Sequence, residues 1–381
     1  MRILHICLAG YYSVGWGYQD NLLAEQNAKD GHEVFVIASQ YQRTTENEIE
    51  KVPAGEYKLD NGITVIRIPM KFEWLGFLKD KIRMFRGLYV NIERVKPDVV
   101  FVHCPQFLDF SVVGEYAKVH PNVAFYADNH ASMLNSARNF LSRSILHRLV
   151  YRSVIRKNYW YLRKIFYVTY DTRDFLQNIY GIRDKLEFMP LCGTLYSRDE
   201  IIEKRKKVRS ELLIREDTIV IIHCGKLNKE KKTIEVLQEF SKTKIGNIIL
   251  IVIGSLDTDI RDEATKLMKS DKRIMYLGWK SKKELDNYLC ASDILLQPGS
   301  QSVVFQQAIA CGNMVILESN QSTEYLVSWG NGILLDSTNE ISALLSSLSE
   351  NQEKLCSFER NSFEFAQNEL NYQVQSRKFV E

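Results

Sequence analysis

Short apolar runs of strand length recur along the chain, and each is followed by a loop rich in glycine or polar residues. Segments with the apolar spacing of helices separate these runs. Continuous apolar runs are typical of parallel strands whose two faces are both buried. Strands that alternate with helices favour a doubly wound α/β fold. In the first half of the chain the runs cover residues 2–8, 33–38, 64–68, 99–102, 123–126, 164–169 and 186–189.

The alternation begins again after a charged segment, residues 198–216, in which we place the junction between two domains. A chain of 381 residues is long enough for about two to three domains. We therefore expect two Rossmann-like, doubly wound domains that face a central cleft. The first covers residues 1–196 and the second residues 197–361, and a final helix over 362–381 returns to the first. The strands expected in the second half are 218–223, 248–253, 274–277, 294–296, the run after Gly312, 324–327 and 330–335.

Composition and charge exclude several classes of protein. Charged residues make up 25% and hydrophobic residues 45% of the chain, as in ordinary soluble domains. The net charge of +3 does not predict a nucleic-acid binder. The seven cysteines are scattered without a CxxC pair, so we expect a reducing compartment, with neither a disulfide framework nor a zinc site. No run approaches the ~20 apolar residues of a membrane span, and the N-terminus lacks a signal layout, so a cytoplasmic protein is expected.

The loop after the first expected strand contains Gly15 and Gly17, just before a helix pattern. The glycines do not follow the GxGxxG spacing, so a dinucleotide fingerprint is absent. Glycine nevertheless permits a ligand to approach the backbone at the N-terminus of a helix. The sequence therefore predicts ligand contact at this loop.

Two histidines, His103 and His130, follow expected strands, and Asp128 stands close to the second. Ligands of parallel α/β sheets bind at the carboxyl ends of the strands, so these side chains are candidates for a functional site. A single histidine is more often structural than catalytic. Two histidines at strand ends in one half of the chain leave both interpretations open.

The loop after the first strand of the second half contains Gly225, Lys226 and Lys231. Glycine beside a strand end and ammonium groups at a helix start favour the binding of a diphosphate. Ser300 and Ser302 can cap the next such helix and leave its N–H groups for an anion. The alternatives are a solvated lysine cluster and a plain crossover helix. We interpret this half as the holder of a nucleotide diphosphate, and the first half as the acceptor-binding half.

Two stretches, residues 71–96 and 138–164, mix basic with aromatic side chains. In the second, Arg148, Arg152 and Arg156 recur at four-residue spacing. A solvated helix face is one interpretation, and a surface that meets anionic lipid headgroups is another. RNA binding ranks third, because no recognition module accompanies the charge.

Other chemistries find little support in the motifs. The sequence contains no GxxxxGK[ST] loop for nucleoside triphosphate hydrolysis and no GxSxG elbow for acyl hydrolysis. It also contains no cluster of residues at metal-ligand spacing, so no metal is expected.

Several short motifs, taken in order, resemble those of the retaining GT-B glycosyltransferases of family 4. Single motifs are weak, but their order and spacing together are fairly specific, and the resemblance covers nearly the whole chain. The residues that carry it are 31–34, 98–100 with His103, 190–193, 225–227 with Lys231, 277–278, 291–294, 307–312 and 330–335.

The resemblance implies transfer of a sugar from a nucleotide-sugar to an acceptor, with retention at the anomeric carbon and without a metal or other cofactor. By the same resemblance Lys226 and Lys231 hold the donor diphosphate, with lysine in place of the family's usual arginine at 226. Positive charge there stabilises the leaving group. His130 matches a histidine near the donor sugar, with His103 and Asp128 on the acceptor side. Gly15, Gly17 and Gly278 match positions near the donor.

One motif departs from the family pattern. The family usually has two glutamates separated by seven residues, the second contacting ribose hydroxyls. Here Gln307 stands at the second position and the first has no counterpart. An amide can still hydrogen-bond a ribose diol, but it brings no charge. Ser300, Gln301 and Ser302 occupy the region that would face the donor sugar and phosphate, so donor choice is expected to depend on this turn.

The sequence thus predicts a glycosyltransferase that uses a UDP- or GDP-linked sugar in surface polysaccharide biosynthesis. The acceptor is expected to be a glycan or lipid-linked molecule, with the protein cytoplasmic or peripheral on the inner face of the membrane. No nucleic acid is expected as a partner. The alternatives are a GT-B-fold binding subunit without turnover and, ranked lower, a nucleotide-sugar epimerase, for which no carboxylate and histidine set suited to proton exchange stands out.

Overall fold

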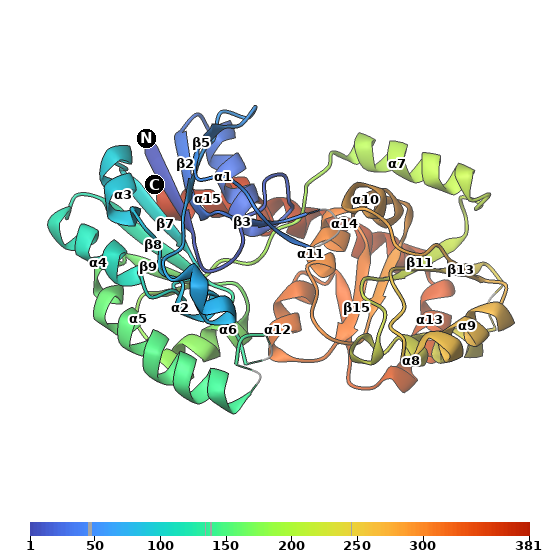
Figure 1. Cartoon of the computed structure of the whole chain (residues 1–381). Coiled ribbons are helices and arrows are strands. Elements are labelled where there is room, and N and C mark those ends of the chain that lie inside the picture. Colours follow the sequence, from blue (N-terminus) through green and yellow to red (C-terminus); the bar gives the residue numbers. More distant parts are fainter. Residues whose placement is uncertain (45–47, 134, 138, 245) are drawn as a thin grey trace. The chain divides into compact units, whose positions relative to one another are not determined.

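A computed structural model (Figure 1) describes residues 1–44, 48–133, 135–137, 139–244 and 246–381. The chain divides into two compact units. Unit 1 consists of Met1–Pro190 and Tyr372–Glu381, and unit 2 of Leu191–Asn371. In Figure 1 the main part of unit 1 is coloured from blue to green, and unit 2 from yellow-green to orange-red.

Unit 1 is built on a sheet with the strand order β10-β9-β8-β7-β1-β2-β6-β5. All neighbouring pairs are parallel except β5 and β6. A separate pair, β3 and β4, is antiparallel. The strands are β1 (Arg2–Cys7), β2 (Glu33–Ser39), β3 (Tyr41–Arg43), β4 (Ile49–Lys51), β5 (Gly55–Lys58), β6 (Thr64–Ile68), β7 (Val99–His103), β8 (Ala124–Asn129), β9 (Lys164–Tyr167) and β10 (Leu186–Phe188).

Helices cover both faces of this sheet. α1 and α15 pack on one face, where Phe379 of α15 lies with its ring centroid 4.5 Å from that of Phe101. α3, α4 and α5 pack on the other face. The helical segments are α1 (Gln19–Lys29), η1 (Glu73–Leu78), α2 (Lys79–Ile82), α3 (Leu88–Val95), α4 (Phe110–Val119), η2 (Leu141–Tyr151), α5 (Arg152–Asn158), η3 (Tyr159–Tyr161), α6 (Tyr170–Phe175), η4 (Leu176–Tyr180) and α15 (Tyr372–Val380).

Unit 2 is built on a second sheet with the order β13-β12-β11-β14-β15-β16, in which every pair is parallel. In chain order this is 3-2-1-4-5-6, the order of a doubly wound Rossmann sheet. α8, α9 and α13 cover one face, and α10, α11 and α14 the other. The strands are β11 (Ile219–Cys224), β12 (Ile248–Ile253), β13 (Ile274–Tyr276), β14 (Ile294–Gln297), β15 (Met314–Glu318) and β16 (Gly332–Leu335).

The helices of unit 2 include one that the sequence pattern did not predict. The charged segment after residue 197 forms the helix α7, which begins with a capping box between Ser197 and Glu200. The helical segments are α7 (Arg198–Glu211), η5 (Lys229–Lys231), α8 (Thr233–Lys242), α9 (Arg261–Ser270), α10 (Lys282–Ala291), α11 (Val304–Ala310), α12 (Gln321–Glu324), η6 (Tyr325–Val327), η7 (Thr338–Glu340), α13 (Ile341–Ser349) and α14 (Gln352–Asn368).

Two expectations about individual elements are wrong. Residues 324–327 are not a strand but the end of α12 and η6, because Asn320 starts a helix with a capping box. The single final helix is instead α14 in unit 2 and α15 in unit 1. Asn368 and Asn371 flank the break, and asparagine competes with the helix for backbone hydrogen bonds.

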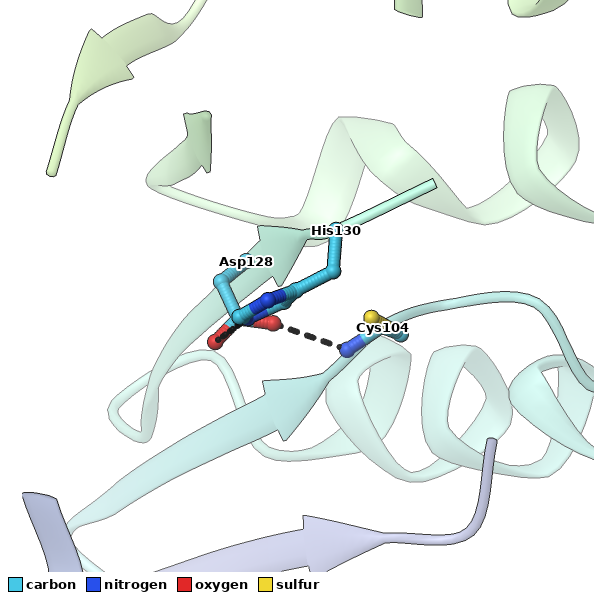
Figure 2. A group of neighbouring side chains, drawn as sticks. All are labelled: Cys104, Asp128 and His130. Atoms are coloured by element: carbon cyan, nitrogen blue, oxygen red, sulfur yellow. Dashed lines mark hydrogen bonds and ion pairs between the residues drawn. The ribbon is translucent and has the colours of Figure 1, made fainter. Parts of the chain in front are cut away.

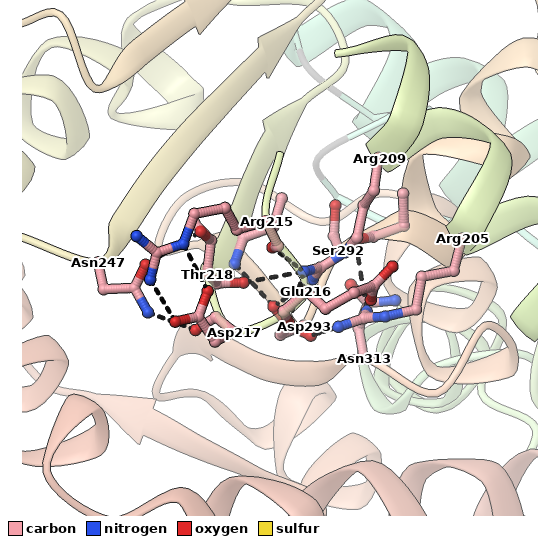
Figure 3. Close-up of polar contacts among 12 residues, drawn as sticks. Arg205, Arg209, Arg215, Glu216, Asp217, Thr218, Asn247, Ser292, Asp293 and Asn313 are labelled. Atoms are coloured by element: carbon pink, nitrogen blue, oxygen red, sulfur yellow. Dashed lines mark hydrogen bonds and ion pairs between the residues drawn. The ribbon is translucent and has the colours of Figure 1, made fainter. Parts of the chain in front are cut away.

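A buried ion pair fastens α7 to the N-terminal edge of the unit 2 sheet (Figure 3). Arg209 is fully buried, and its Nη2 atom lies 2.8 Å from Oδ2 of Asp293. Asp293 also accepts hydrogen bonds from Arg205 and from the backbone N–H of Val220. The other N–H groups of Arg209 donate to the backbone carbonyl oxygens of Ala291, Arg215, Glu216 and Thr218.

Each sheet has one switch point, where the chain order reverses and a ligand crevice forms at the carboxyl ends of the strands. In unit 1 the switch point lies between β1 and β7, and in unit 2 between β11 and β14. The candidate ligand-binding loops are therefore those that follow these four strands.

Among the helices that the structure describes, none combines the length and the apolar character of a membrane-spanning segment.

Candidate functional site

The two loops at the switch point of unit 2 are in direct backbone contact. After β14, the N–H of Ser300 donates to the carbonyl oxygen of Glu230, which follows β11, at 2.8 Å. A Cβ atom on Gly299 would lie 2.4 Å from that same oxygen. Because real Cβ atoms do not approach so closely, Gly299 is needed for the two loops to meet.

Lys231 reaches from the first of these loops to the second. Its side chain is buried, and Nζ donates to the carbonyl oxygens of Ser300 and of Gln301, the latter at 3.2 Å. Nζ also lies 5.6 Å from the ring centroid of Phe305. Burial lowers the pKa of Lys231 to about 8, because the charged form loses solvation. The structure thus brings three of the predicted donor-site residues together.

Lys226 lies on the outside of the same loop. Its side chain is 73% exposed, and Nζ is 3.4 Å from Oδ2 of Asp257. Beneath it, Gly254 approaches Gly225 so closely that a Cβ atom on Gly254 would lie 1.7 Å from the Gly225 carbonyl oxygen. The carbonyl oxygen of Gly278 in turn accepts a hydrogen bond from the N–H of Gly254 at 2.8 Å. Gly278 is therefore part of the backbone next to the predicted donor loop.

The helix after β14 is not capped as predicted. α11 begins at Val304, and its N-cap position is Val303, which has no hydrogen-bonding side chain. Oγ of Ser302 lies 3.5 Å from the N atom of Val304, at the long limit of a hydrogen bond. Ser300 contributes to this site through its backbone. The predicted serine caps are therefore wrong for Ser300 and at most weak for Ser302.

Gln307 is engaged within unit 2. Its Oε1 atom accepts a hydrogen bond from the N–H of Thr194 at 2.8 Å, and its Nε2 atom donates to the carbonyl oxygen of Thr194 at 3.1 Å. Gly193 also packs against α11, because a Cβ atom there would lie 2.8 Å from Cβ of Ala310. The prediction that Gln307 contacts a ribose stays a prediction. It requires the amide to leave Thr194 or to share its hydrogen bonds.

In unit 1 the predicted residues gather at the carboxyl ends of β7 and β8, and Figure 2 draws two of them, Asp128 and His130, with Cys104. The two strands pair with His103 opposite Asp128. Oδ2 of Asp128 lies 3.1 Å from Nδ1 of His103 and 3.2 Å from Nε2 of His130. Oδ1 of Asp128 accepts the backbone N–H of Cys104 at 2.9 Å. All three predicted acceptor-side residues therefore belong to one hydrogen-bonded group.

The charges in this group stabilise one another. Burial raises the pKa of Asp128, but His130 and His103 outweigh it, and the net pKa is far below the usual range. Burial likewise lowers the pKa of His130, but the carboxylate of Asp128 outweighs it and the net pKa is raised. The His130 side chain is 34% exposed, whereas His103 is buried. His130 is thus the more accessible histidine of this group, and His103 contacts Asp128 from the buried side.

The buried end of this group includes residues that the sequence did not single out. His5 on β1 stacks on His103, and its Nδ1 atom lies 3.0 Å from Nε2 of His103. Its Nε2 atom lies 3.0 Å from Oδ1 of Asn27. Burial lowers the pKa of His5 to about 3, so the ring is neutral. The sequence did not predict the contact of His5 with His103, because the contact depends on strand order. β1 and β7 are far apart in sequence but adjacent in the sheet.

The glycine-containing loop after β1 borders the same switch point. Gly15 has a φ of +78°, which favours glycine, and both Gly15 and Gly17 are exposed. The loop is shaped by Asn21, whose Nδ2 atom donates to the carbonyl oxygens of Ser13 and Trp16, each at 2.7 Å. The loop therefore has the fixed shape and the exposed backbone that ligand contact requires.

Metal-ligating side chains also meet in unit 1. Cys104, Asp128 and His130 each offer one ligand atom, and these atoms lie within 4.8 Å of one another. Burial raises the pKa of the Cys104 thiol well above its usual value. No local spacing in the sequence indicates this group, because the cysteine and the histidine follow different strands.

Comparison with known proteins supplies the family. Residues 204–365 match the family model described as glycosyl transferases group 1, and residues 21–191 match the model described as glycosyltransferase family 4. The two matches follow one another and together extend over most of the chain. The chain belongs to the group 1, family 4 glycosyltransferases. Its two Rossmann-like units are those of the GT-B fold, as the sequence predicted.

Solved structures agree with this family in fold. HepE from Anabaena in complex with UDP is similar with a TM-score of 0.67 and 16% identity, over 99% of this chain and 98% of that chain. A sucrose-phosphate synthase from Thermosynechococcus elongatus is similar with a TM-score of 0.67 and 15% identity, over 99% and 96%. WaaG, a glycosyltransferase involved in lipopolysaccharide biosynthesis, has a TM-score of 0.63 and 15% identity, over 99% of both chains.

One curated relative is similar in sequence over a shorter stretch. It is a Klebsiella pneumoniae protein described as an uncharacterized 41.2 kDa protein in the cps region, and it is 27% identical over 134 residues. The match covers 34% of this chain and 36% of that protein, so the chain spans about a third of the relative's length.

Proposed function

We propose that this family member transfers a sugar from a nucleotide-diphosphate sugar to an acceptor hydroxyl with retention of configuration. The observation that carries the proposal is the position of Lys231, a buried ammonium group held between the two loops of the unit 2 switch point. A switch point is where doubly wound sheets bind nucleotides. The solved relative HepE holds UDP, UDP with glucose, or UDP-glucose in three crystal structures, which favours a UDP-linked donor.

On the donor side, Lys231 and Lys226 contact the diphosphate in this proposal. When the bond from the anomeric carbon to the diphosphate breaks, negative charge grows on the departing oxygen, and fixed positive charge stabilises it. The backbone of Gly278 and the exposed loop with Gly15 and Gly17 approach the donor. The turn of Ser300, Gln301 and Ser302, together with Gln307, selects the ribose and sugar.

On the acceptor side, His130 contacts the reacting sugar or acceptor, and Asp128 orients its ring. His103 holds Asp128 in place from the buried side. Support comes from the exposure of His130 and from the hydrogen bonds that join the three side chains. The proposal uses no metal and no other cofactor.

We also propose that the acceptor is attached to a membrane, as a lipid-linked or glycan molecule of surface polysaccharide biosynthesis, and that the protein acts on the cytoplasmic face. Large apolar side chains are exposed in both basic stretches of unit 1, among them Trp74, Phe77, Leu141 and Leu149. No acidic residue occurs between Asn129 and Tyr170, so this surface suits anionic headgroups. The cps-region relative agrees with a role in a surface polysaccharide.

The experiment that tests the proposal incubates the protein with UDP- and GDP-linked hexoses, with and without detergent-solubilised lipid acceptors. Release of nucleotide diphosphate together with a glycosylated acceptor supports transfer, and NMR of the new linkage reports retention. Nucleotide binding without turnover would instead favour the non-catalytic subunit. An isomerised sugar formed without acceptor would favour an epimerase.

A further inference from the structure

A second kind of ligand fits unit 1 at the ends of β7 and β8. The side chains of Cys104, Asp128 and His130 bring a thiol, a carboxylate and an imidazole to one point (Figure 2), with their ligand atoms within 4.8 Å of one another. Thiolate, imidazole and carboxylate are the ligands that Zn²⁺ takes in proteins, and three protein ligands with one open position are common in its sites.

The spacing of one pair of ligand atoms is close to that in a zinc centre. Zinc bonds of about 2.0–2.2 Å at tetrahedral angles place a nitrogen and an oxygen ligand roughly 3.3–3.6 Å apart. Nε2 of His130 and Oδ2 of Asp128 are 3.2 Å apart. Zn²⁺ would therefore bridge these two atoms in place of their direct contact.

Hydrogen bonds from neighbouring groups orient the carboxylate of Asp128 as a metal ligand. Asp128 accepts hydrogen bonds from the His103 ring and from the backbone N–H of Cys104, and His103 is in turn held by His5. Such outer partners orient ligands and raise metal affinity. His130 and Cys104 are both partly exposed, so an ion can enter from solvent.

We propose that Cys104, Asp128 and His130 form an inhibitory site for Zn²⁺. Binding displaces the thiol proton of Cys104 and the proton on Nε2 of His130 to solvent, and forms a metal–thiolate and a metal–imidazole bond with no change of oxidation state. The ion occupies Nε2 of His130, so it replaces the contact with Asp128 that orients the ring in the proposed reaction. The binding part stands by itself, whereas the inhibition rests on the proposed transferase function.

Binding is tested on the full-length protein after removal of metals with a chelator. Titration with Co²⁺, a spectroscopic substitute for Zn²⁺, is expected to give a thiolate-to-cobalt absorption band, and calorimetry with Zn²⁺ is expected to give one ion per chain. Loss of a group that merely contacts a metal ligand typically weakens metal binding about 10- to 100-fold, and loss of a ligand itself should cost at least as much. Cys104→Ser should therefore remove the band and weaken Zn²⁺ binding by about 100-fold. His130→Gln should also weaken binding. Cys356→Ser, at an exposed cysteine of unit 2, is the matched control and should change neither result.

The site is overturned if Cys104→Ser keeps the thiolate band, or if Cys104→Ser and His130→Gln bind Zn²⁺ as the Cys356→Ser control does. The inhibition is tested with the transfer assay. Zn²⁺ should inhibit the wild-type protein reversibly, and Cys104→Ser should keep its basal activity and resist inhibition. Equal inhibition of both proteins contradicts the inhibitory role. If no transfer occurs with any donor, the titrations still decide whether the metal site exists.

Discussion

The ammonium group of Lys231 lies 3.2 Å from the backbone carbonyl oxygen of Gln301. This contact joins the loop after β11 to the loop after β14, the two strands on either side of the switch point in unit 2. Carbonyl oxygens carry only partial negative charge, so they do not neutralise the buried ammonium group. A diphosphate at the same place would neutralise it, and this is the basis of the donor site proposed here.

The first prediction concerns pH. Because burial lowers the pKa of Lys231 to about 8, the side chain loses its charge as the pH rises from 7 to 9.5. Binding of a diphosphate favours the charged form, so the affinity for UDP should fall through this range. In Lys231→Met the fall should be absent. Calorimetric titration of UDP at several pH values measures both, and a wild-type affinity that does not change between pH 7 and 9.5 contradicts the assignment.

The same lowered pKa affects stability without nucleotide. Between about pH 8 and the ordinary lysine pKa of 10.5, the unfolded state binds the Lys231 proton more tightly than the folded state. The free energy of unfolding should therefore gain a favourable contribution as the pH rises through this window. Lys231→Met removes that contribution, so the difference in stability between variant and wild type should change with pH across it.

The second prediction concerns the contact between the two loops. Gly299→Ala places a methyl group 2.4 Å from the carbonyl oxygen of Glu230, and the backbone must move. We expect a loss of about 1–3 kcal/mol in stability, with weaker UDP binding. Gly246→Ala is the control, because a Cβ atom there meets nothing within 4 Å. Thermal unfolding and UDP titration check both, and equal behaviour of the two variants would show that the loops do not touch as described.

The third prediction concerns the buried ion pair of unit 2. Asp293→Asn leaves the charge of Arg209 without its carboxylate partner in the interior, which typically costs about 3–5 kcal/mol. Urea unfolding followed by fluorescence measures the loss. Asp217→Asn, which breaks an exposed pair with Arg215, serves as the control and should change the unfolding midpoint little. A midpoint for Asp293→Asn that equals the control argues against the network.

The fourth prediction concerns the proposed membrane surface. Leu141, Ile145 and Leu149 are exposed on η2 at four-residue spacing, so they lie along one side of this helical segment. Replacing all three with serine should lower sedimentation with anionic liposomes at least about tenfold, since each buried side chain contributes about 1.5–3 kcal/mol. Leu213→Ser, at an exposed leucine of unit 2, is the control. Sedimentation that the triple variant leaves unchanged removes the surface from the proposal.

Much of the fold could be predicted because parallel strands buried on both faces are continuous apolar runs. The run 248–253, for example, is β12 with the same bounds. Short polar strands such as β5, Gly55–Lys58, carry no such signal. Residues 324–327 are wrongly predicted as a strand because a short apolar run does not distinguish strand from helix, and Asn320 is the helix cap that decides between them.

The candidate sites were predictable as sets of residues but not as contacts. The sequence could place His103 and His130 at strand ends, yet the contact between His5 and His103 depends on strand order, which no local pattern encodes. Likewise, no local signal joins Gln307 to Thr194, because the pair forms only when α11 packs against the preceding segment. Residues that are neighbours within a single loop, by contrast, could be predicted from the sequence alone to lie close together.

The most direct test of the donor site is the binding of UDP to Lys231→Met, measured by calorimetry beside the wild type and the control Lys269→Met. Loss of a hydrogen bond from a charged group costs about 1.5–3 kcal/mol, so the affinity should fall roughly 10- to 150-fold. Lys269 lies on the exposed side of α9, and its variant should bind as the wild type does. UDP affinity in Lys231→Met equal to that of the control would contradict the assignment of the unit 2 switch point as the donor site.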